Sequence, residues 1–403
     1  MGSMDTPAIV SLLDTDMYKF TMQYAVFRCY NSVDVEYEFH NRSPEMKLNQ
    51  AGLSWLRKQI DLMSLLRVTA DELDFLKKSN DKFSQEYLAY LRLLELDPTN
   101  QVFCGFNDQN ELSIQIRGKW VDVIMWEVPL LLLTSQAYFM FVDTDWNYKG
   151  QREKACRKSK TLVDHNCVFS EFGTRRRRDL KTQIMVMEGI LSANPGSTFT
   201  GTSNVHLAHK FGLKPIGTVA HEWTMGIAAL MGTYAKSNFI ALEKWAEIYG
   251  DSAGIALPDT FGTDAFLKDF NKETALKFSG VRQDSGDPST FVIKMSKFYA
   301  AMGIDTQSKT IVFSDGLDTQ KVIELKQSAD HYNFKSFFGI GTFFTNDFTN
   351  SHGDKSKPMN IVIKLSKADD RFAIKLSDES AKHTGDVEEV RRAKEDLAWV
   401  GKS

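Results

Sequence analysis

Residues 214–230 read K-P-I-G-T-V-A-H-E-W-T-M-G-I-A-A-L and predict a short strand that leads directly into a helix. Ile216, Thr218 and Val219 are typical of a buried strand. His221 stands where this apolar run breaks, and apolar residues at helical spacing follow it. The first N–H groups of a helix lack partners within it, so a histidine at such a junction can meet an anion. A largely neutral imidazole can also be a nucleophile, a base or a metal ligand, and a plain role in packing the helix start stays open.

The chain beyond residue 149 alternates strands with helices, a pattern that predicts parallel βα units. Seven short strands, most of them followed by a helix, indicate an α/β fold, an irregular α/β barrel whose functional residues lie at the carboxyl ends of the strands. We expect these strands at Ser197–Gly201, Pro215–Val219, Gly254–Leu257, Lys277–Val281, Thr310–Phe313, Phe337–Ile340 and Asn360–Lys364.

The first part of the chain has a different pattern, which predicts an N-terminal α+β domain at 1–148 beside a barrel domain at 149–403. A C-terminal segment of the barrel domain is expected to pack back on the N-terminal domain. Apolar periodicity predicts helices at 17–27, 53–66, two within 70–96, and 127–143, with strands at 33–39, 102–106, 112–116 and 121–124. The last three strands predict an antiparallel meander. Asp16 is expected to cap the first helix.

The composition excludes several classes of protein. The 403 residues carry 49 basic and 52 acidic side chains, a net charge of −3, so nothing global attracts nucleic acid or an anionic membrane. The four cysteines lie far apart with no C-x-x-C pair, which argues against a zinc ribbon or a disulfide scaffold. The longest apolar run, 128–134, is far shorter than the roughly 20 residues of a membrane span. We expect a cytoplasmic protein, or in a eukaryote also a nuclear one.

Two kinds of polar loop follow the later strands. The loop 280–288, G-V-R-Q-D-S-G-D-P, holds Arg282 and Asp284, which could orient a sugar and bind phosphate-bound Mg²⁺, although a simple turn explains its last residues equally well. The loops 314–318 and 339–342 are rich in glycine and open onto helices, as phosphate-binding loops do. The chain has neither a P-loop nor a complete G-x-G-x-x-G.

Two further patterns have competing interpretations. The basic run 175–178 could bind RNA, but no aromatic residues are interleaved with it, and Phe172 with Arg175 suits a flat, anionic small molecule better. His206 and His209 share a helix face, but no carboxylate stands at the spacing of a zinc motif.

Taken together, these motifs resemble the nicotinate phosphoribosyltransferase family, and they occur in that family's order from about residue 10 to residue 400. The matching segments are D-T-D-M-Y-K at 14–19, S-E-F-G-T-R-R-R at 170–177, G-T-S-N at 201–204, G-T-V-A-H-E-W at 217–223, L-P-D-T-F at 257–261, G-V-R-Q-D-S-G-D-P at 280–288, S-D-G-L-D at 314–318 and G-I-G-T at 339–342. The resemblance implies transfer of phosphoribose from 5-phosphoribosyl 1-pyrophosphate to nicotinate, with Mg²⁺ and coupled ATP hydrolysis, in NAD salvage. It also implies a homodimer with shared active sites.

The resemblance further assigns roles by position. His221 corresponds to a histidine phosphorylated by ATP, and Asp284 to the acid that binds the ribose and magnesium. The other implied substrate-binding residues are Phe172 and Tyr18, the latter from the partner subunit, as rings around the pyridine, Arg282, Thr218 and Arg175 near nicotinate, and Gly316, Gly341 and Thr342 around the 5-phosphate.

Two expectations and several alternatives stand beside this resemblance. Asp259, at a strand end, is the expected orienting partner of His221. The loop that contains Ser203 has no acid, which favours nicotinate over nicotinamide because a carboxylate there would repel nicotinate. The alternatives are a nicotinamide-using enzyme, a catalytically silent phosphate-binding scaffold and a nucleic-acid binder.

Overall fold

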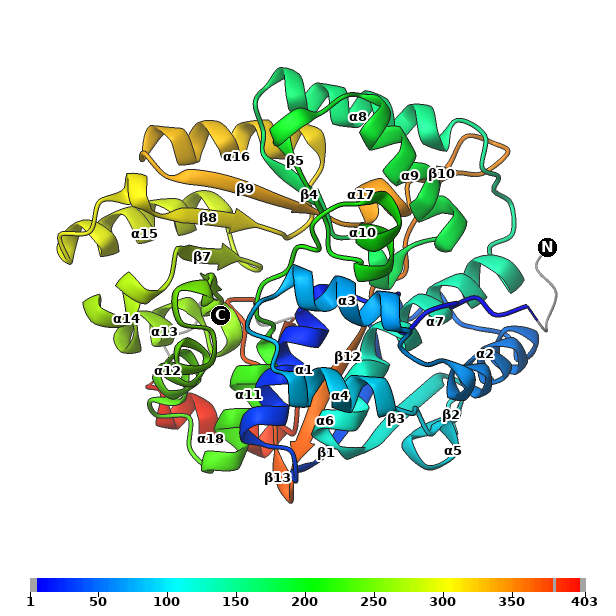
Figure 1. The fold of residues 1–403 in the computed structure, drawn as a ribbon, viewed down its shortest axis with the longest axis horizontal. Coiled ribbons are helices and arrows are strands. Elements are labelled where there is room, and N and C mark those ends of the chain that lie inside the picture. The colour runs from blue at the N-terminus through cyan, green and yellow to red at the C-terminus, as the bar shows by residue number, and fades with distance from the viewer. Residues whose placement is uncertain (1–5, 380–381, 399–403) are drawn as a thin grey trace. The chain divides into compact units, whose positions relative to one another are not determined.

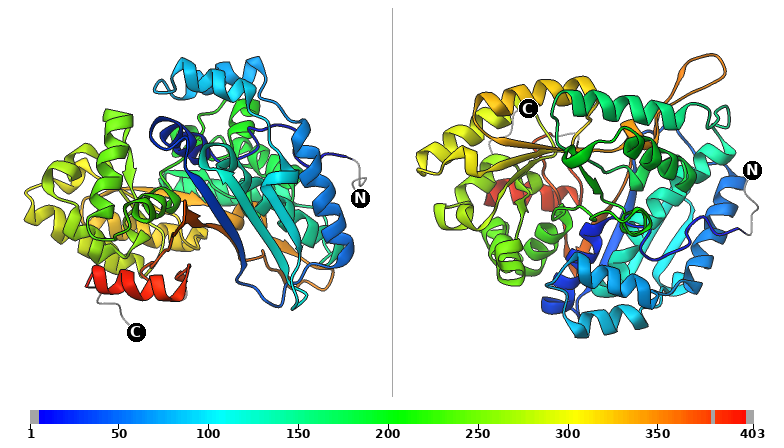
Figure 2. Two further views of the ribbon diagram at one scale, coloured as in Figure 1. Left: turned by 90° about the horizontal axis from the view of Figure 1, so that it is seen from below. Right: turned by 45° about the horizontal axis from the view of Figure 1, so that its top comes forward.

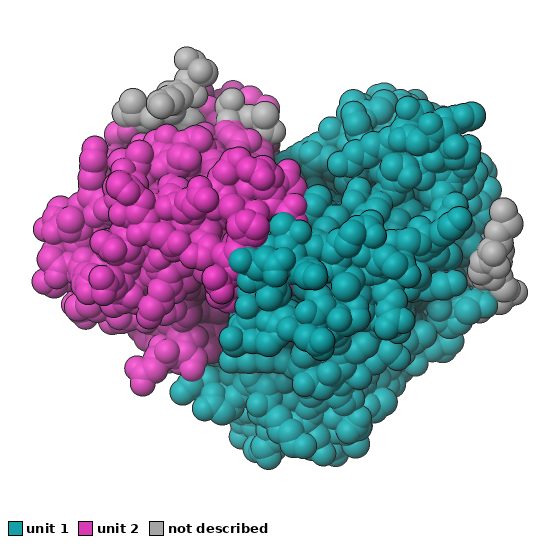
Figure 3. All heavy atoms as spheres, turned by 90° about the horizontal axis from the view of Figure 1, so that it is seen from above, with its two compact units in different colours: residues 1–164, 170–217, 340–364 teal, residues 165–169, 218–339, 365–403 magenta. Residues whose placement is uncertain are grey.

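The computed structural model describes residues 6–379 and 382–398, which divide into two compact units (Figure 3). Unit 1 comprises the described parts of 1–164, 170–217 and 340–364. Unit 2 comprises 165–169, 218–339 and the described parts of 365–403. Both units are discontinuous, so they do not follow a single division at residue 148. Residues 340–364 group with the N-terminal part of the chain, whereas the chain from 365 groups with unit 2.

Unit 1 contains an antiparallel sheet in which β1 (Asp34–Asn41) and β2 (Val102–Phe106) both pair with β3 (Leu112–Lys119) (Figure 2). The beginning of β12 (Ile361–Ala368) lies beside β1 in this sheet. The predicted β2–β3 hairpin is confirmed. Two predictions were wrong: residues 121–124 begin a buried helical segment instead of a third strand, and β12 is antiparallel instead of part of a βα unit.

The helices of unit 1 largely follow the predicted periodicity. They are α1 (Met17–Cys29), α2 (Gln50–Leu62), α3 (Ala70–Ser79), α4 (Gln85–Leu93), α5 (Pro98–Gln101), α6 (Trp120–Val123), α7 (Glu127–Phe141), α8 (Gln151–Asp164), α9 (Leu180–Ser192), α10 (Val205–Phe211) and α17 (Thr342–Thr345). Asp16 occupies the position before α1, but its side chain makes no capping hydrogen bond, which corrects the predicted cap. Within the described chain, the helical run Trp120–Phe141 is long and apolar enough to cross a membrane. However, 89% of its most apolar stretch is buried inside the protein, as in a core helix.

Unit 2 is built on a parallel sheet with the order β9-β8-β7-β6, of which Figure 1 labels the first three strands. These strands are β6 (Ile255–Ala256), β7 (Gly280–Gln283), β8 (Thr310–Phe313) and β9 (Lys335–Ile340). The helices of this unit are α11 (His221–Met231), α12 (Ser237–Tyr249), α13 (Thr263–Asp269), α14 (Lys272–Lys277), α15 (Pro288–Ala301), α16 (Thr319–His331) and α18 (Val387–Asp396). A parallel sheet with helices, separate from an antiparallel sheet, confirms the mixed α/β fold class.

The close approach of β7 to β8 explains why residue 280 is a glycine. A Cβ atom at Gly280 would lie 1.9 Å from the carbonyl oxygen of Thr310, its partner in the parallel register. Only glycine fits there, and this places Arg282 and the residues that follow it opposite the end of β8.

The strand predicted at Pro215–Val219 does not form. Pro215 makes a single parallel bridge with Thr202, the last residue of β5 (Phe199–Thr202), and residues 216–220 have no regular structure. Proline lacks the N–H that would extend this ladder. The predicted helix start at His221 is confirmed, and Gly232 ends α11 in the left-handed conformation. The short strands β4 (Phe169–Glu171), β10 (Phe348–Thr349), β11 (Lys355–Ser356) and β13 (Arg371–Phe372) were not predicted.

Candidate active site

Unit 2 gathers a cluster of ionisable side chains around the imidazole of His221, which is the first residue of α11 and only 6% exposed. Its Nδ1 lies 3.0 Å from Oγ1 of Thr260, in the turn after β6. Its Nε2 lies 3.2 Å from Oδ2 of Asp284 and 3.7 Å from Oδ1 of Asp259. The same nitrogen lies 3.0 Å from Nζ of Lys375, which follows β13. Three sequence-distant segments therefore meet at one ring.

Asp259, the predicted orienting partner of His221, is buried in this cluster. Its Oδ2 accepts hydrogen bonds from Ser285 (2.6 Å) and Lys375 (3.2 Å). Its Oδ1 is buried and has no hydrogen-bond partner in the described chain. Burial alone would raise the pKa of Asp259, but the Lys375 ammonium outweighs it and leaves the pKa lowered. The carboxylate is thus held charged, with one oxygen still able to accept a donor.

Asp284 and Arg282 form an ion pair at the carboxyl end of β7. Arg282 Nη2 donates to Asp284 Oδ1 at 2.7 Å, Nε donates to Ser314 Oγ at 2.8 Å and Nη1 donates to Thr218 Oγ1 at 3.0 Å. Ser314 Oγ also lies 2.7 Å from Asp284 Oδ1. Burial would raise the pKa of Asp284, but the guanidinium of Arg282 outweighs it and places the pKa well below the usual range. The structure therefore brings together three predicted site residues, Thr218, Arg282 and Asp284.

These donors suit both phosphate and cation chemistry. The ligand atoms of His221, Asp259 and Asp284 all lie within 4.8 Å of one another, and the Oδ1 of Asp259 is unsatisfied. Carboxylate oxygens are the ligands that Mg²⁺ prefers, usually alongside water and bound phosphate oxygens. The guanidinium of Arg282 and the ammonium of Lys375 supply positive charge for an anion in the same place. The cluster can thus hold a phosphate group and its cation.

A second group of predicted residues meets within unit 1, around the buried carboxylate of Glu127. Tyr18 OH lies 3.4 Å from Glu127 Oε2, and Nη1 of Arg175 lies 3.9 Å from Oε1. Lys19 forms an ion pair with the same carboxylate. Burial would raise the pKa of Glu127, but Lys19 and Arg175 outweigh it and lower the pKa. Glu127 thereby fixes two predicted substrate-binding residues that are far apart in sequence.

Ser203, predicted from an acid-free loop, has a carboxylate as its neighbour. Its Oγ donates to Oδ1 of Asp16 at 2.7 Å, which explains why Asp16 does not cap α1. Burial raises the pKa of Asp16.

The predicted aromatic residue Phe172 follows β4 and is half-buried, and its N–H donates to the carbonyl of Ile340 at 2.8 Å.

The two glycine-rich loops predicted to bind phosphate belong to different units. Gly341 directly precedes the four-residue helix α17, which begins at Thr342 in unit 1. Gly316 belongs to unit 2 and is exposed, with a φ of 56° that favours glycine.

The basic run 175–178 is not a nucleic-acid patch, because Arg177 and Arg178 are both 0% exposed. Arg177 forms a bidentate ion pair with Asp14, at 2.7 and 2.6 Å. The guanidinium of Arg178 lies over the rings of Phe139 (3.5 Å) and Phe348 (4.2 Å). This arrangement contradicts the RNA-binding interpretation.

Comparison with known proteins identifies the family of this chain. The model of the nicotinate phosphoribosyltransferase (NAPRTase) family matches residues 167–399, and that of its N-terminal domain matches residues 13–135. The chain belongs to the nicotinate phosphoribosyltransferase family.

Relatives of this nicotinate phosphoribosyltransferase family member match over nearly their whole length. A Schizosaccharomyces pombe relative is 45% identical over 98% of this chain and 99% of its own. The nicotinate phosphoribosyltransferase of Saccharomyces cerevisiae is 43% identical, over 99% of this chain and 97% of its own. A crystal structure from Saccharomyces cerevisiae has a TM-score of 0.95 and 42% identity, covering 99% of this chain and 100% of that one.

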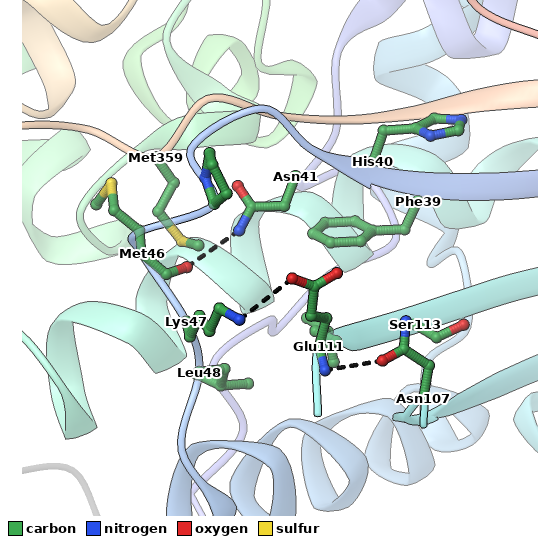
Figure 4. Close-up of a pocket in the computed structure, with 12 residues that line it drawn as sticks. Phe39, His40, Asn41, Met46, Lys47, Leu48, Asn107, Glu111, Ser113 and Met359 are labelled. Atoms are coloured by element: carbon green, nitrogen blue, oxygen red, sulfur yellow. Dashed lines mark hydrogen bonds and ion pairs between the residues drawn. The ribbon is translucent and has the colours of Figure 1, made fainter. Parts of the chain in front are cut away.

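A separate hollow of about 300 Å³ lies in unit 1, beside the ends of β1 and β3 (Figure 4). The ion pair Lys47–Glu111 (3.2 Å) spans it, and Asn41 donates to the carbonyl of Met46 on its wall. Burial lowers the pKa of His40, which also lines it. None of the predicted site residues lines this hollow, so it is separate from the family's motifs.

Sequence reasoning missed several members of these two clusters: Thr260, Ser314 and Lys375 in unit 2, and Lys19 and Glu127 in unit 1. One signal was available for Lys375, because it is a lone charge within the otherwise apolar run Ala373–Leu376. A charged residue inside a buried apolar run needs a partner, which marks it for inspection. Glu127 gave no comparable signal, since it reads as an ordinary first-turn acid of α7.

Proposed function

We propose that this chain transfers phosphoribose from 5-phosphoribosyl 1-pyrophosphate to nicotinate, giving nicotinate mononucleotide and pyrophosphate. Its membership of the nicotinate phosphoribosyltransferase family supports the substrates, and the His221 cluster supports the chemistry. The observation that carries the proposal is the buried imidazole held between two carboxylates and a lysine, beside the Arg282–Asp284 pair.

The cluster matches the charges that develop in this reaction. Breaking the bond between C1 of the ribose and pyrophosphate leaves positive charge on the sugar ring and negative charge on the leaving group. In the proposal Asp284 lies next to the sugar and stabilises the first charge, while Arg282 contributes to the second. The pyridine nitrogen of nicotinate attacks with its own lone pair, so no general base is needed. His221 is therefore free for phosphate chemistry.

We further propose that ATP phosphorylates His221 and that the resulting phosphohistidine couples ATP hydrolysis to turnover. The Asp259 carboxylate holds the Lys375 ammonium beside the imidazole and balances the charge of that ammonium. Mg²⁺ would be held by Asp284 through water or pyrophosphate oxygens and would neutralise phosphate charge there. The carboxylates of the cluster and the open oxygen of Asp259 fit such a cation.

The remaining assignments of the proposal follow the family's motifs. Phe172 and Tyr18 flank the pyridine ring, Tyr18 from the partner subunit of a homodimer, and Arg175 contacts nicotinate. The 5-phosphate is bound by Gly316, Gly341 and Thr342. The cytoplasm is the proposed location.

The decisive experiment measures nicotinate mononucleotide formation with and without ATP, for the wild type and for His221→Ala. We expect the wild type to respond to ATP and the variant to form product slowly at a rate that ATP does not raise. A wild type that forms no mononucleotide from nicotinate overturns the function. Equal ATP stimulation in the variant would instead remove the phosphohistidine.

The preference for nicotinate is tested at Ser203. The alternative substrate, nicotinamide, would be favoured by an acid at this loop, which could accept its amide. We expect Ser203→Asp to lose nicotinate turnover and to gain nicotinamide turnover, measured side by side. The matched Ser203→Asn variant controls for size without charge. No gain toward nicotinamide would show that the loop does not set specificity.

A further inference from the structure

Lys375 is a buried lysine whose ammonium reaches the ring nitrogen of His221. Its side chain is 5% exposed, and its Nζ lies 3.0 Å from His221 Nε2 and 3.2 Å from Asp259 Oδ2. A lysine is rarely this buried unless it is paired. Asp259 provides the counter-charge, but it does not explain why the ammonium also approaches the imidazole.

The contact restricts which nitrogen of His221 carries the proton. An ammonium can only donate hydrogen bonds, and so can a protonated ring nitrogen. The 3.0 Å contact is therefore favourable when Nε2 keeps its lone pair and Nδ1 carries the hydrogen. Nδ1–H then donates to Oγ1 of Thr260 at 3.0 Å. All three groups are satisfied in this arrangement.

Asp284 exerts the opposite preference, because its Oδ2 lies 3.2 Å from the same Nε2 and would accept a hydrogen bond from Nε2–H. Asp284 already has two donors on its other oxygen, from Arg282 and Ser314, both at 2.7 Å. Its charge is therefore compensated without His221. Lys375 makes the shorter contact to Nε2, at 3.0 Å against 3.2 Å for Asp284.

We propose that Lys375 keeps Nε2 of His221 free of a proton and then pairs with the phosphoryl group formed on that nitrogen. This proposal rests on the proposed function, since ATP is the phosphoryl donor. Nε2 faces Asp284, whose side chain is 19% exposed, whereas Nδ1 faces the fully buried Thr260. Lys375 is a positioning residue for the nucleophile before the reaction and a counter-ion to its product.

The chemical step balances without a proton leaving the site. The lone pair of Nε2 attacks the γ-phosphorus of ATP, the N–P bond forms, and the bond to the bridging oxygen breaks with its electron pair leaving on ADP. The ring retains the Nδ1 proton and becomes a phosphoimidazolium. The new phosphoryl oxygens bring negative charge between Asp259 and Asp284, which only a cation makes tolerable. Lys375 is already in place to supply it.

The test uses the full chain with Lys375→Met and Lys375→Arg, and with Lys309→Met as the matched control. Lys309 is also a buried lysine of unit 2, but it donates to the backbone carbonyls of Ala275 and Phe278 and lies over the ring of Tyr299, away from His221. The first measurement is the rate of transfer of ³²P from γ-labelled ATP to the protein. We expect Lys375→Met to slow it by roughly 100-fold, as the loss of one charge-stabilising donor typically does. Lys375→Arg should restore about half of that loss on the logarithmic scale, and Lys309→Met should label normally.

The second measurement needs no ATP and reports the tautomer directly. Long-range ¹H–¹⁵N spectra of histidine-labelled protein, with His221 assigned by comparison with His221→Gln, distinguish a proton on Nδ1 from one on Nε2. We expect Nδ1–H in the wild type and a shift toward Nε2–H in Lys375→Met. A loss of fold alone would not move the proton from one ring nitrogen to the other in a protein whose other histidine signals are unchanged.

Three results would overturn the proposal: Nε2–H in the unmodified wild type, phosphate attached to Nδ1, or wild-type labelling in Lys375→Met. Each of them leaves mononucleotide formation by the wild type intact, so the proposed function would survive. A wild type that makes mononucleotide but takes up no ³²P would instead overturn the phosphohistidine together with the counter-ion role of Lys375. The tautomer spectrum would then decide the positioning role alone.

Discussion

Two buried ionic networks, one in each unit, differ in how completely their carboxylates are satisfied. In unit 1, Asp14 receives donors on both oxygens, from Arg177 twice and from Asn204 at 2.8 Å. In unit 2, Asp259 leaves Oδ1 without a hydrogen-bond partner in the described chain. The carboxylate of the first network is therefore closed, although Nε of Arg177 has no hydrogen-bond partner among the described residues, and this network stabilises the fold. The second keeps one carboxylate oxygen that can still accept a donor or a cation.

Breaking the closed network should have the largest effect. Arg177→Met leaves the buried Asp14 carboxylate without its counter-ion, and we expect it to cost about 3–5 kcal/mol of unfolding free energy, measured by urea denaturation. The double variant Arg177→Met with Asp14→Leu removes both charges and should recover much of that loss. A loss below about 1 kcal/mol in the single variant would mean that this pair is not an essential part of the unit 1 core.

Changing the open network should reduce phosphorylation more than stability. Asp259→Asn removes the counter-charge of Lys375 and weakens its hold on the ammonium, so ATP-dependent labelling of His221 should fall by about 10–100-fold. The unfolding free energy should change by less than about 2 kcal/mol, since the amide keeps the contact with Ser285. Ser285→Ala is the control that removes this contact and keeps the charge. Unchanged ³²P labelling in Asp259→Asn would contradict its positioning role.

The closed network should also show in the acid limb of stability. Burial alone would raise the pKa of Asp14, but Arg177 outweighs it, and the folded-state pKa lies below the ordinary value. The stabilisation is therefore complete above the unfolded pKa of about 3.9 and is lost as the pH falls through the folded pKa. The difference in unfolding free energy between the wild type and Asp14→Asn should accordingly shrink at low pH, by about 1.4 kcal/mol per unit of pKa difference. A pH-independent difference would mean that the pKa is not lowered.

The smallest effect on stability is expected at Arg178. This buried cation contacts aromatic rings, whereas the cations of the other two networks contact carboxylates. Its Nε and Nη1 lack hydrogen-bond partners within the described residues, and burial lowers its pKa to about 9. Arg178→Met loses the bond to Ser356 and the ring contacts, but it also removes a desolvated charge, so stability should change by no more than about 1 kcal/mol. A loss comparable to that of Arg177→Met would show that aromatic rings can replace a carboxylate as its partner.

The sequence predicted elements where local pattern and tertiary partners agree. The strand predicted at Thr310–Phe313 is β8 residue for residue, because an apolar run flanked by helices had two parallel neighbours to pair with. The predicted strand Pro215–Val219 had equally suitable residues but obtained only one bridge, and β-propensity alone does not supply a partner. Residues 121–124 became helical for the same reason, since β1 and β2 already occupy both edges of β3.

The candidate site was predictable where residues follow strand ends and hidden where contacts are long-range. Arg282 lies near the carboxyl end of β7 and Asp284 directly follows that strand, so their proximity to the end of β8 could be expected. Lys375 meets His221 across 154 residues, and no spacing rule links the two. Asp16 looked like a helix cap, but the hydroxyl of Ser203, 187 residues away, competes successfully for its carboxylate.

The missing side chain at Gly280 has a consequence for the chemistry two residues further along. Even a methyl group at position 280 would collide with the Thr310 carbonyl and force β7 and β8 apart. The guanidinium of Arg282 on one strand and the hydroxyl of Ser314 beyond the other would then separate. The absence of a Cβ atom at Gly280 therefore fixes how closely Arg282 and Ser314 approach each other.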